Sequence, residues 1–394
     1  MPTHSQAHGL GPLKLIGFLE SAGWAAFFIY FPIYLGDAGL SNFQIGVVVA
    51  APTLVGMFSG PIWGALSDYL GRRKPFMIQS AVSTSVFIFL AALTQSFSWL
   101  LVLGLLRGLF TPVLEGLTVT NLFSLSGRGK MGRVFGGYAT WKSLGWAFSA
   151  MMSGALSQLL GVRATLYLSS LMFILIAAAA LSIPDPAVSL PRGESGFSVS
   201  AGLLRVALSA LRAPKLLLFL LASLPVYLAI NAMMTFFPIY LEAVGAAPVL
   251  VGAVFTVPVF FEALIFSRIG RIADVAGGKR RLLVMSSAAH FLLFLLTGIF
   301  RNPLILFLVY SALDPVAWPP LFTASSTFIS QMLPPERWAI GQTLYNIWAW
   351  SLSPVLGSLI GGWVSDLMGF PAMFILISGL AALSCALFTQ VRES

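Results

Sequence analysis

Twelve long apolar runs constrain the fold of this 394-residue sequence more than any other feature. A helix needs about 20 mostly apolar residues to cross a bilayer. Because the bilayer core offers backbone groups no water, a chain that crosses it repeatedly does so as helices or as a closed barrel. With 58% hydrophobic and only 9% charged residues, the sequence predicts an all-α integral membrane protein of twelve transmembrane helices. The predicted helices are 12–35, 43–66, 75–94, 98–124, 134–160, 164–183, 216–241, 248–269, 282–300, 303–331, 338–364 and 370–390.

The second half of the sequence repeats the first at a constant offset of 206 residues. The segment from Phe31 to Leu35 reads Phe-Pro-Ile-Tyr-Leu, and the same five residues recur from Phe237. Several isolated glycines and prolines follow the same register. A gapless internal repeat of this length indicates two copies of one unit that run in the same direction. We therefore predict two pseudo-symmetric six-helix bundles, residues 1–184 and 215–394, joined by a polar linker at 185–214.

The polar turn after the second apolar run carries the most specific motif. It reads Gly-Ala-Leu-Ser-Asp-Tyr-Leu-Gly-Arg-Arg-Lys, with a glycine suited to a tight turn and basic residues at a membrane face. The second half repeats its Gly, Asp and Gly at the same offset of 206. The residues of this loop and its repeat are Gly64, Asp68, Gly71, Arg72, Arg73, Gly270, Asp274 and Gly277.

This loop closely resembles the signature loop of the major facilitator superfamily of transporters. The resemblance implies that superfamily's fold, in which two bundles rock around a central substrate site. It also implies that the loop holds the cytoplasmic gate shut. We then expect Asp68 near Trp338, at the start of the eleventh helix, because a helix N-terminus favours a carboxylate. Gly56, Gly60 and Gly64 would give the second helix a small-residue face for this contact.

The distribution of basic residues predicts the orientation. Of the 22 Lys and Arg residues, only Arg163 and Arg301 fall in loops on the side opposite the termini. Cytoplasmic loops are enriched in Lys and Arg, so both termini and the linker are expected in the cytoplasm, with the protein in the cell membrane. The net charge of +9 then reflects contact with anionic lipid, and no nucleic-acid partner is expected.

Ionisable residues inside the predicted spans are the candidates for function, because such groups are costly in a bilayer unless paired or hydrated. Arg107, Thr111, Glu115 and Thr118 have the spacing of one helical face, which we expect to look into the bundle. Glu115 and Lys142 lie at similar depth on consecutive helices and are predicted to pair. The pair either faces the substrate cavity or only fixes helix packing.

Glu20 is the first candidate for proton coupling. Trp24, Phe27 and Phe31 follow it at helical spacing and predict an aromatic cavity wall, although aromatic stripes more often serve packing. A buried carboxyl group without a dedicated basic partner can bind and release a proton during transport. Glu115 and Asp314 are the alternative carriers.

The second half offers a weaker set of candidates. Asp314 is next in register to Arg107, which makes a contact between them conceivable. Glu262 either pairs with His290 or joins the basic loop that begins at Arg268. The cavity candidates of the whole chain are Trp24, Phe27, Arg107, Lys142, Asn231, Gln342, Tyr345 and Asn346.

These features predict a secondary active transporter that is proton-coupled and moves a small organic solute by alternating access. Efflux of amphipathic compounds by drug–proton antiport is an alternative, although the fifth helix lacks the Gly-Pro-rich motif that exporters of the superfamily often carry. A membrane sensor on the same fold is another. No P-loop, zinc-ligand spacing or nucleophile elbow is present, so we expect no enzyme activity, cofactor or metal. The expected partners are the solute, protons and the lipid bilayer, and the expected state is a monomer.

Overall fold

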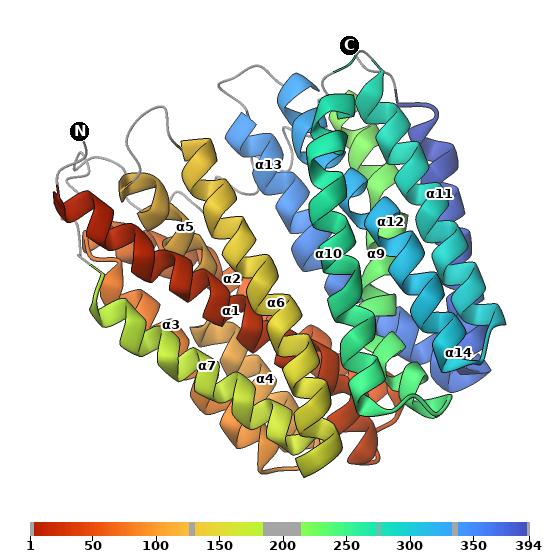
Figure 1. Ribbon diagram of the computed structural model, residues 1–394, viewed down its shortest axis with the longest axis horizontal. Helices are drawn as coiled ribbons and strands as arrows, with labels where there is room; N and C mark the ends of the chain where they lie inside the picture. Colours follow the sequence, from red (N-terminus) through yellow and green to blue (C-terminus); the bar gives the residue numbers. More distant parts are fainter. Residues whose placement is uncertain are drawn as a thin grey trace. The chain divides into compact units, whose positions relative to one another are not determined.

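A computed structural model describes residues 4–125, 131–183, 214–273, 275, 277–332 and 338–391 of the chain. The described residues form helices and short connections and include no strand (Figure 1). The chain divides into two compact units, one of Met1–Ala38 with Ala51–Val199 and the other of Gly39–Ala50 with Ser200–Ser394. The second helix is therefore divided, because its first nine residues belong to the second unit.

The first half of the chain contains the helices that the apolar runs predict, with one exception. Helix α1 packs along α6 and α7, and α3 packs on α7. A side chain at Gly145 in α6 would place its Cβ 2.2 Å from the backbone oxygen of Phe18 in α1. Only glycine allows these two backbones to approach so closely. The helices are α1 (His4–Asp37), α2 (Asn42–Tyr69), α3 (Lys74–Ala92), α4 (Phe97–Phe110), α5 (Leu114–Leu125), α6 (Met131–Leu160) and α7 (Arg163–Leu181).

The exception is the helix predicted at 98–124, which is broken into α4 and α5. Pro112 lies in the break. Proline lacks the backbone N–H that a helix interior needs, and it disfavours helical geometry in the residue before it. Thr111 accordingly ends α4, with φ −114° and ψ 0°, and its hydroxyl donates to the carbonyl oxygen of Arg107 at 2.6 Å. The prediction of one continuous helix here is wrong.

In the second half, α14 packs against α9 and α11, and α12 packs against α10 and α11. The two helices predicted at 338–364 and 370–390 meet inside α14 at Gly369, whose φ of 81° turns the chain without a separate loop. The helices are α9 (Pro214–Ala243), α10 (Pro248–Ala273), α11 (Gly278–Ile299), α12 (Pro303–Met332), α13 (Trp338–Ile347), the π-helical turn η2 (Trp348–Leu352) and α14 (Ser353–Phe388).

The internal repeat extends to individual contacts. The Tyr34 hydroxyl donates to the carbonyl of Thr94 at 2.7 Å. At the same offset of 206, Tyr240 donates to the carbonyl of Phe300 at 2.9 Å. Two pairs of positive-φ glycines follow the same register: Gly39 at 78° with Gly245 at 89°, and Gly71 at 63° with Gly277 at 73°. The two halves thus share local geometry as well as sequence.

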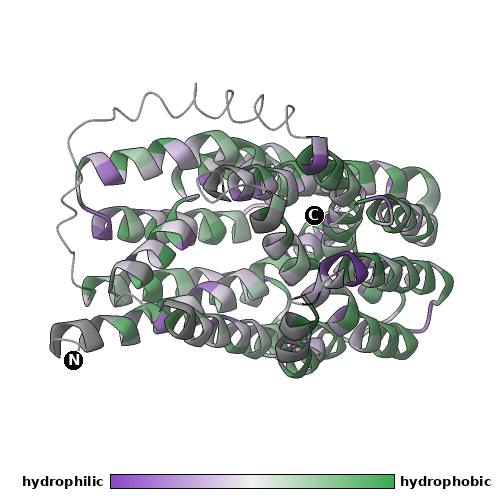
Figure 2. Cartoon of the chain, turned by 90° about the horizontal axis from the view of Figure 1, so that it is seen from above, coloured by the Kyte–Doolittle hydropathy of each residue, from purple (hydrophilic) through white to green (hydrophobic). Residues whose placement is uncertain are grey.

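The described helices have the character of membrane spans. Nine segments are long and apolar enough to cross a bilayer, and one of them, Gly341–Phe388, contains the last two predicted spans. Helices α6 and α10 correspond to the remaining two. Hydrophobic residues are spread along the helices (Figure 2), and large side chains such as Phe58 and Ile62 are 64% and 67% exposed. Such exposure suits contact with lipid, so the chain is an all-α, multi-pass membrane protein.

Candidate functional site

Three ionisable groups meet in the first unit, on α1, α5 and α6. The Lys142 ammonium forms an ion pair with the carboxylate of Glu115, as the depths of the two residues predict. Glu20 is only 2% exposed and lies within electrostatic range of both groups. We call these three residues the coupling cluster.

The charges of the coupling cluster do not balance when all three groups are ionised. Two carboxylates then face one ammonium, which leaves a net charge of −1. The Oε1 of Glu115 already contacts Lys142, whereas the Oε2 of Glu20 is buried with no hydrogen-bond partner among the described residues. One proton on Glu20 would make the cluster neutral, so its arrangement suits proton binding and release.

Arg107 is separate from the coupling cluster. Its guanidinium carbon lies 4.6 Å from the ring centre of Phe27 and 5.4 Å from that of Trp24. The polar stripe predicted around it is not one helical face, because the break at Pro112 intervenes. Arg107 is 8% exposed, whereas the Glu115 side chain is 62% exposed.

The aromatic residues of α1 form a continuous stack. Trp24 stacks on Phe28 with ring centres 4.9 Å apart, and Phe27 stacks on Phe31 at 4.3 Å. Phe28 is 42% exposed, so this stack is not fully enclosed by packing. Part of it is accessible, as a ligand-binding wall requires. That Trp24 and Phe27 line the substrate cavity stays a prediction.

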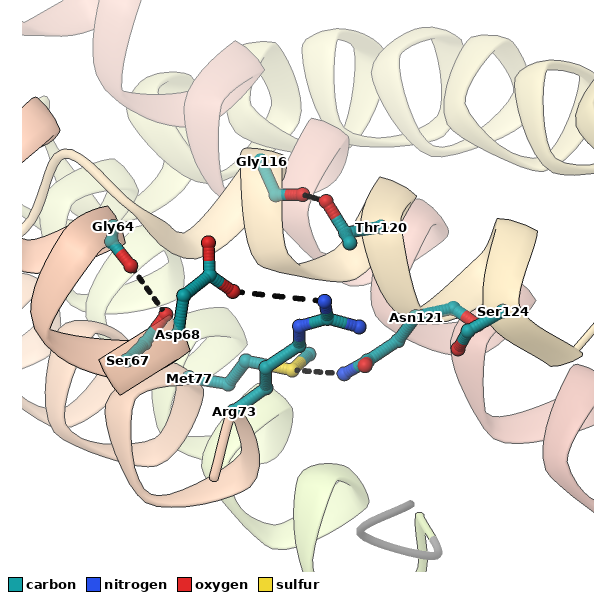
Figure 3. Close-up of polar contacts among 9 residues, drawn as sticks. All are labelled: Gly64, Ser67, Asp68, Arg73, Met77, Gly116, Thr120, Asn121 and Ser124. Carbon is teal, nitrogen blue, oxygen red and sulfur yellow. Dashed lines mark hydrogen bonds and ion pairs between the residues drawn. The ribbon is translucent and has the colours of Figure 1, made fainter. Parts of the chain in front are cut away.

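The signature loop is held by contacts within the first unit (Figure 3). Asp68 lies 3.6 Å from the guanidinium of Arg73, which extends beside α5 in the figure. The hydroxyl of Ser67 donates to the carbonyl of Gly64 at 2.9 Å. The turn needs glycine at position 71, where φ is 63°. Arg72 is exposed at the tip of this turn.

The small-residue face of α2 has a neighbour within the first unit. A Cβ on Gly56 or Gly60 would lie 3.5–3.6 Å from Pro112, and one on Gly64 would meet nothing within 4 Å. This face therefore packs on the α4–α5 break. The predicted approach of Asp68 to Trp338 stays a prediction.

The repeat of the loop is partly described. Gly270 lies within α10, and Gly277 precedes α11 with φ 73°. Asp274 lies outside the described residues.

In the second unit, the carboxyl groups of Glu262 and Asp314 lie close enough to interact, and the hydroxyl of Tyr310 lies beside Asp314. Two carboxyl groups this close repel each other when both are ionised. Of the two partners predicted for Glu262, His290 has its Nδ1 2.9 Å from the carbonyl oxygen of Ser286, and the side chain of Arg268 lies outside the described residues. The contact between Arg107 and Asp314 stays a prediction.

The predicted polar residues of the second unit form two groups. Asn231 donates to the carbonyl of Tyr227 at 2.8 Å, and the hydroxyls of Tyr227 and Tyr345 are hydrogen-bonded to each other. Gln342 lies 3.4 Å from the side-chain oxygen of Asn346, one turn away. Sequence analysis missed Tyr227, although a tyrosine in an otherwise apolar helix already signals a buried hydroxyl. In the described part of the chain, no group of His, Cys, Asp and Glu could hold a metal ion.

Comparison with known proteins identifies the family. The family model described as "MFS_1 like family" matches residues 10–376. The chain belongs to the MFS_1-like family of the major facilitator superfamily. Its relatives include the multidrug resistance protein MdtG of Klebsiella pneumoniae, 25% identical over 380 residues that cover 92% of this chain and 88% of the relative. They also include the multi-drug resistance efflux pump PmrA of Streptococcus pneumoniae, 25% identical over 396 residues that cover 95% and 93%.

A solved structure shows the same fold. The nucleoside transporter NupG superposes with a TM-score of 0.83 at 14% identity, over 97% of this chain and 98% of that one. Membership of this family makes the protein a secondary transporter, and the likeness to NupG shows the fold of the major facilitator superfamily.

Proposed function

We propose that this MFS_1-like protein is a proton-coupled exporter that exchanges protons for small amphipathic organic solutes. The names of the relatives MdtG and PmrA support efflux. The coupling cluster of the first unit supports proton coupling. Solute transport by such a protein is a binding and conformational cycle, so no enzymatic activity is proposed.

One observation carries this proposal. Glu20 is buried, and one of its carboxylate oxygens has no hydrogen-bond partner among the described residues. Next to it, Lys142 is already paired with Glu115. A proton on Glu20 neutralises the excess negative charge of the cluster, and its release restores that charge. Each protonation state favours a different conformation if the cluster is hydrated in one and enclosed in the other.

The transport cycle follows from the two-bundle architecture. Residues 1–184 rock against residues 215–394, with both termini and the linker 185–214 on the cytoplasmic side of the cell membrane. Trp24 and Phe27 of the first bundle contribute to the solute site. The protein acts as a monomer, because one chain supplies both bundles.

Glu115 and Asp314 are the competing proton carriers. Asp314 lies close to Glu262, and two neighbouring carboxyl groups can share one proton. Glu20 is preferred because one of its buried oxygens has no hydrogen-bond partner among the described residues and because the charges around it do not balance.

Solute flux in proteoliposomes tests the proposed function. Purified protein is reconstituted, and a panel of radiolabelled amphipathic solutes is followed with an inward-acidic gradient, with the reverse gradient and at equal pH. Coupled exchange predicts that solutes accumulate on the acidic side and that the direction reverses with the gradient. Flux that is equal in all three conditions would exclude proton coupling, and no flux of any solute would favour the membrane sensor.

A further inference from the structure

We propose that Arg107 receives an anionic group, so that the preferred solutes are amphipathic organic anions such as aromatic carboxylates. This inference rests on the proposed function and names the class of its solute. It begins from a charge that is buried without a counter-ion. Arg107 is 92% buried, and it has no acidic partner within the described part of the chain.

Neither Glu20 nor Glu115 acts on the charge of Arg107. Glu115 is paired with Lys142, and the charged neighbours that act on Glu20 are Glu115 and Lys142. A buried cation is strongly unfavourable without a partner. The rings of Trp24 and Phe27 compensate part of this charge, but a ring face is no substitute for an ion.

The guanidinium donors are also unused. Arginine carries five N–H donors in a planar fork that matches a carboxylate. None of them bonds a described residue, and none belongs to the buried atoms that lack a partner. These nitrogen atoms therefore reach accessible space. A solute with a carboxylate on an aromatic body would meet the donors with its anion and the α1 stack of Trp24 and Phe28 with its ring.

Matched ligands test the solute class. Binding to purified protein in nanodiscs is measured for aromatic carboxylates from benzoate to pyrene carboxylate and for the corresponding carboxamides. We expect the carboxylates to bind at least about tenfold more tightly, since a hydrogen bond to a charged group is worth that much. Arg107→Gln should abolish this preference and leave carboxamide affinity within about twofold. Arg163→Gln is the matched control, because Arg163 also lies over a ring, that of Tyr34, and should leave the preference intact.

Three results would overturn the anion site. They are equal affinity of carboxylate and carboxamide, a preference that survives in Arg107→Gln, and no binding by any carboxylate of the series. If neutral solutes are still transported when one of these results is found, the anion site is refuted and the transporter function is retained. Carboxylate binding without flux of any solute would instead refute the proposed function.

A separate observation concerns Asp366, at the turn inside α14. Its Oδ1 accepts from the backbone N–H of Asn42 at 2.8 Å, and its Oδ2 accepts from that of Phe43 at 2.9 Å. These are the first two residues of α2. We infer that Asp366 is a latch that holds the start of α2 on α14 in one state of the transport cycle.

The start of α2 needs this carboxylate for two of its donors. Ser41 and Gln44 form a capping box, in which the Ser41 hydroxyl accepts from the Gln44 N–H at 3.3 Å and the Gln44 side chain accepts from the Ser41 N–H at 3.0 Å. The N–H groups of Asn42 and Phe43 are left for Asp366. A carboxylate at this helix terminus is also favoured by the helix dipole.

Two glycines bring the backbones of α2 and α14 together beside this contact. A Cβ on Gly46 would lie 2.3 Å from the carbonyl oxygen of Ser358, and one on Gly362 would lie 2.4 Å from that of Asn42. Residues 42–50 of α2 belong to the second unit for this reason, while its remainder belongs to the first. Because α2 is one continuous helix, a conformational change that moves all of α2 away from α14 has to break the bonds of Asp366.

The latch has the same local sequence as the signature loop. Gly-x-x-Ser-Asp-x-x-Gly occurs from Gly64 to Gly71 and again from Gly362 to Gly369. In both places the serine hydroxyl donates to the carbonyl of the first glycine, at 2.9 and 3.0 Å, and the last glycine has a positive φ. Asp366 therefore stands in the position that Asp68 has in the cytoplasmic loop.

Hydrogen exchange of residues 39–50, together with flux in proteoliposomes, tests the latch. Asp366→Ala should speed exchange at the start of α2 by about fivefold, the effect of losing one helix cap, and should change the transport rate. Asp366→Asn keeps one accepting oxygen and should give an intermediate effect. Ser41→Ala removes a cap within α2 itself, so it should speed exchange and leave transport at the wild-type rate.

Either of two results would refute the latch. Unchanged exchange in Asp366→Ala would show that the contact is not made in the membrane. Equal effects of Asp366→Ala and Ser41→Ala on both readouts would show that Asp366 only caps the helix.

Discussion

The coupling cluster predicts an asymmetry between its two paired members. Lys142→Met leaves Glu20 and Glu115 close together without a cation. Glu115→Gln leaves Lys142 with Glu20 as its remaining acidic neighbour. Loss of the lysine should therefore destabilise the protein more than loss of the glutamate, although both changes remove the same ion pair.

The burial and charge of these residues set the expected changes in the free energy of unfolding. Two unit charges 4 Å apart interact by about 4 kcal/mol at an effective dielectric constant of 20. The Glu115 side chain is 62% exposed, so solvent screening reduces its share to about 1 kcal/mol. Glu20 is 2% exposed, and stranding a buried charge costs about 3 kcal/mol. For a domain of about 150–250 residues, 1 kcal/mol shifts the melting temperature by roughly 2–4 °C.

Thermal unfolding of the purified variants at neutral pH measures this difference. We expect a loss of about 6–12 °C for Lys142→Met and about 2–4 °C for Glu115→Gln, from the same conversion. The double variant should be more stable than Lys142→Met alone, because one of the two stranded carboxylates is gone. Acidic pH should narrow the gap, since protonation of the carboxyls removes their repulsion. Lys142→Arg, which keeps the charge, is the control.

Equal losses for the two single variants would refute this reasoning. So would a double variant whose loss equals the sum of the two single losses, because independent residues behave in that way.

Three further predictions concern the loop, the packing and the second unit. Asp68→Asn should change the transport rate. It should shift the melting temperature by less than about 3 °C, because its ion pair is exposed. Wild-type flux with unchanged accessibility of cytoplasmic cysteine probes would contradict the role of this loop in holding the cytoplasmic gate shut. Gly145→Ala should lower the free energy of unfolding by about 1–3 kcal/mol through overpacking, as measured by thermal unfolding. Gly136→Ala is the control, because its Cβ would meet nothing within 4 Å. Glu262→Gln should fold normally, because it removes one of two neighbouring carboxyl groups. It should also leave gradient-driven flux intact, and loss of that flux would move the proton site to the second unit.

The sequence predicts the framework of this protein because the membrane imposes a simple rule on it. Every span must be apolar and of similar length, so hydropathy and the offset of 206 locate the helices to within a few residues. The break at Pro112 was visible in the sequence as a proline inside a predicted helix. The polar stripe suggested continuity, but the constraint that proline places on Thr111 prevailed.

Which buried residues form pairs depends on how each helix is rotated about its axis. The depth of a residue in the membrane does not specify this rotation. Equal depth identified the pair of Glu115 and Lys142, because the two helices are consecutive. Depth did not reveal that Glu262 lies close to Asp314, because these two residues are on helices that are not consecutive. The capping of α2 by Asp366 joins residues more than 300 positions apart, and sequence analysis of one chain did not reveal it.

Proton coupling at Glu20 is tested most directly by comparing two modes of transport in Glu20→Gln. One is solute flux driven by a pH gradient, and the other is solute exchange at equal pH, both in proteoliposomes with the same solute. Coupling through Glu20 predicts that gradient-driven flux is lost while exchange continues at close to the wild-type rate. If gradient-driven flux survives in Glu20→Gln and is lost in Glu115→Gln or Asp314→Asn, Glu20 is not the proton carrier.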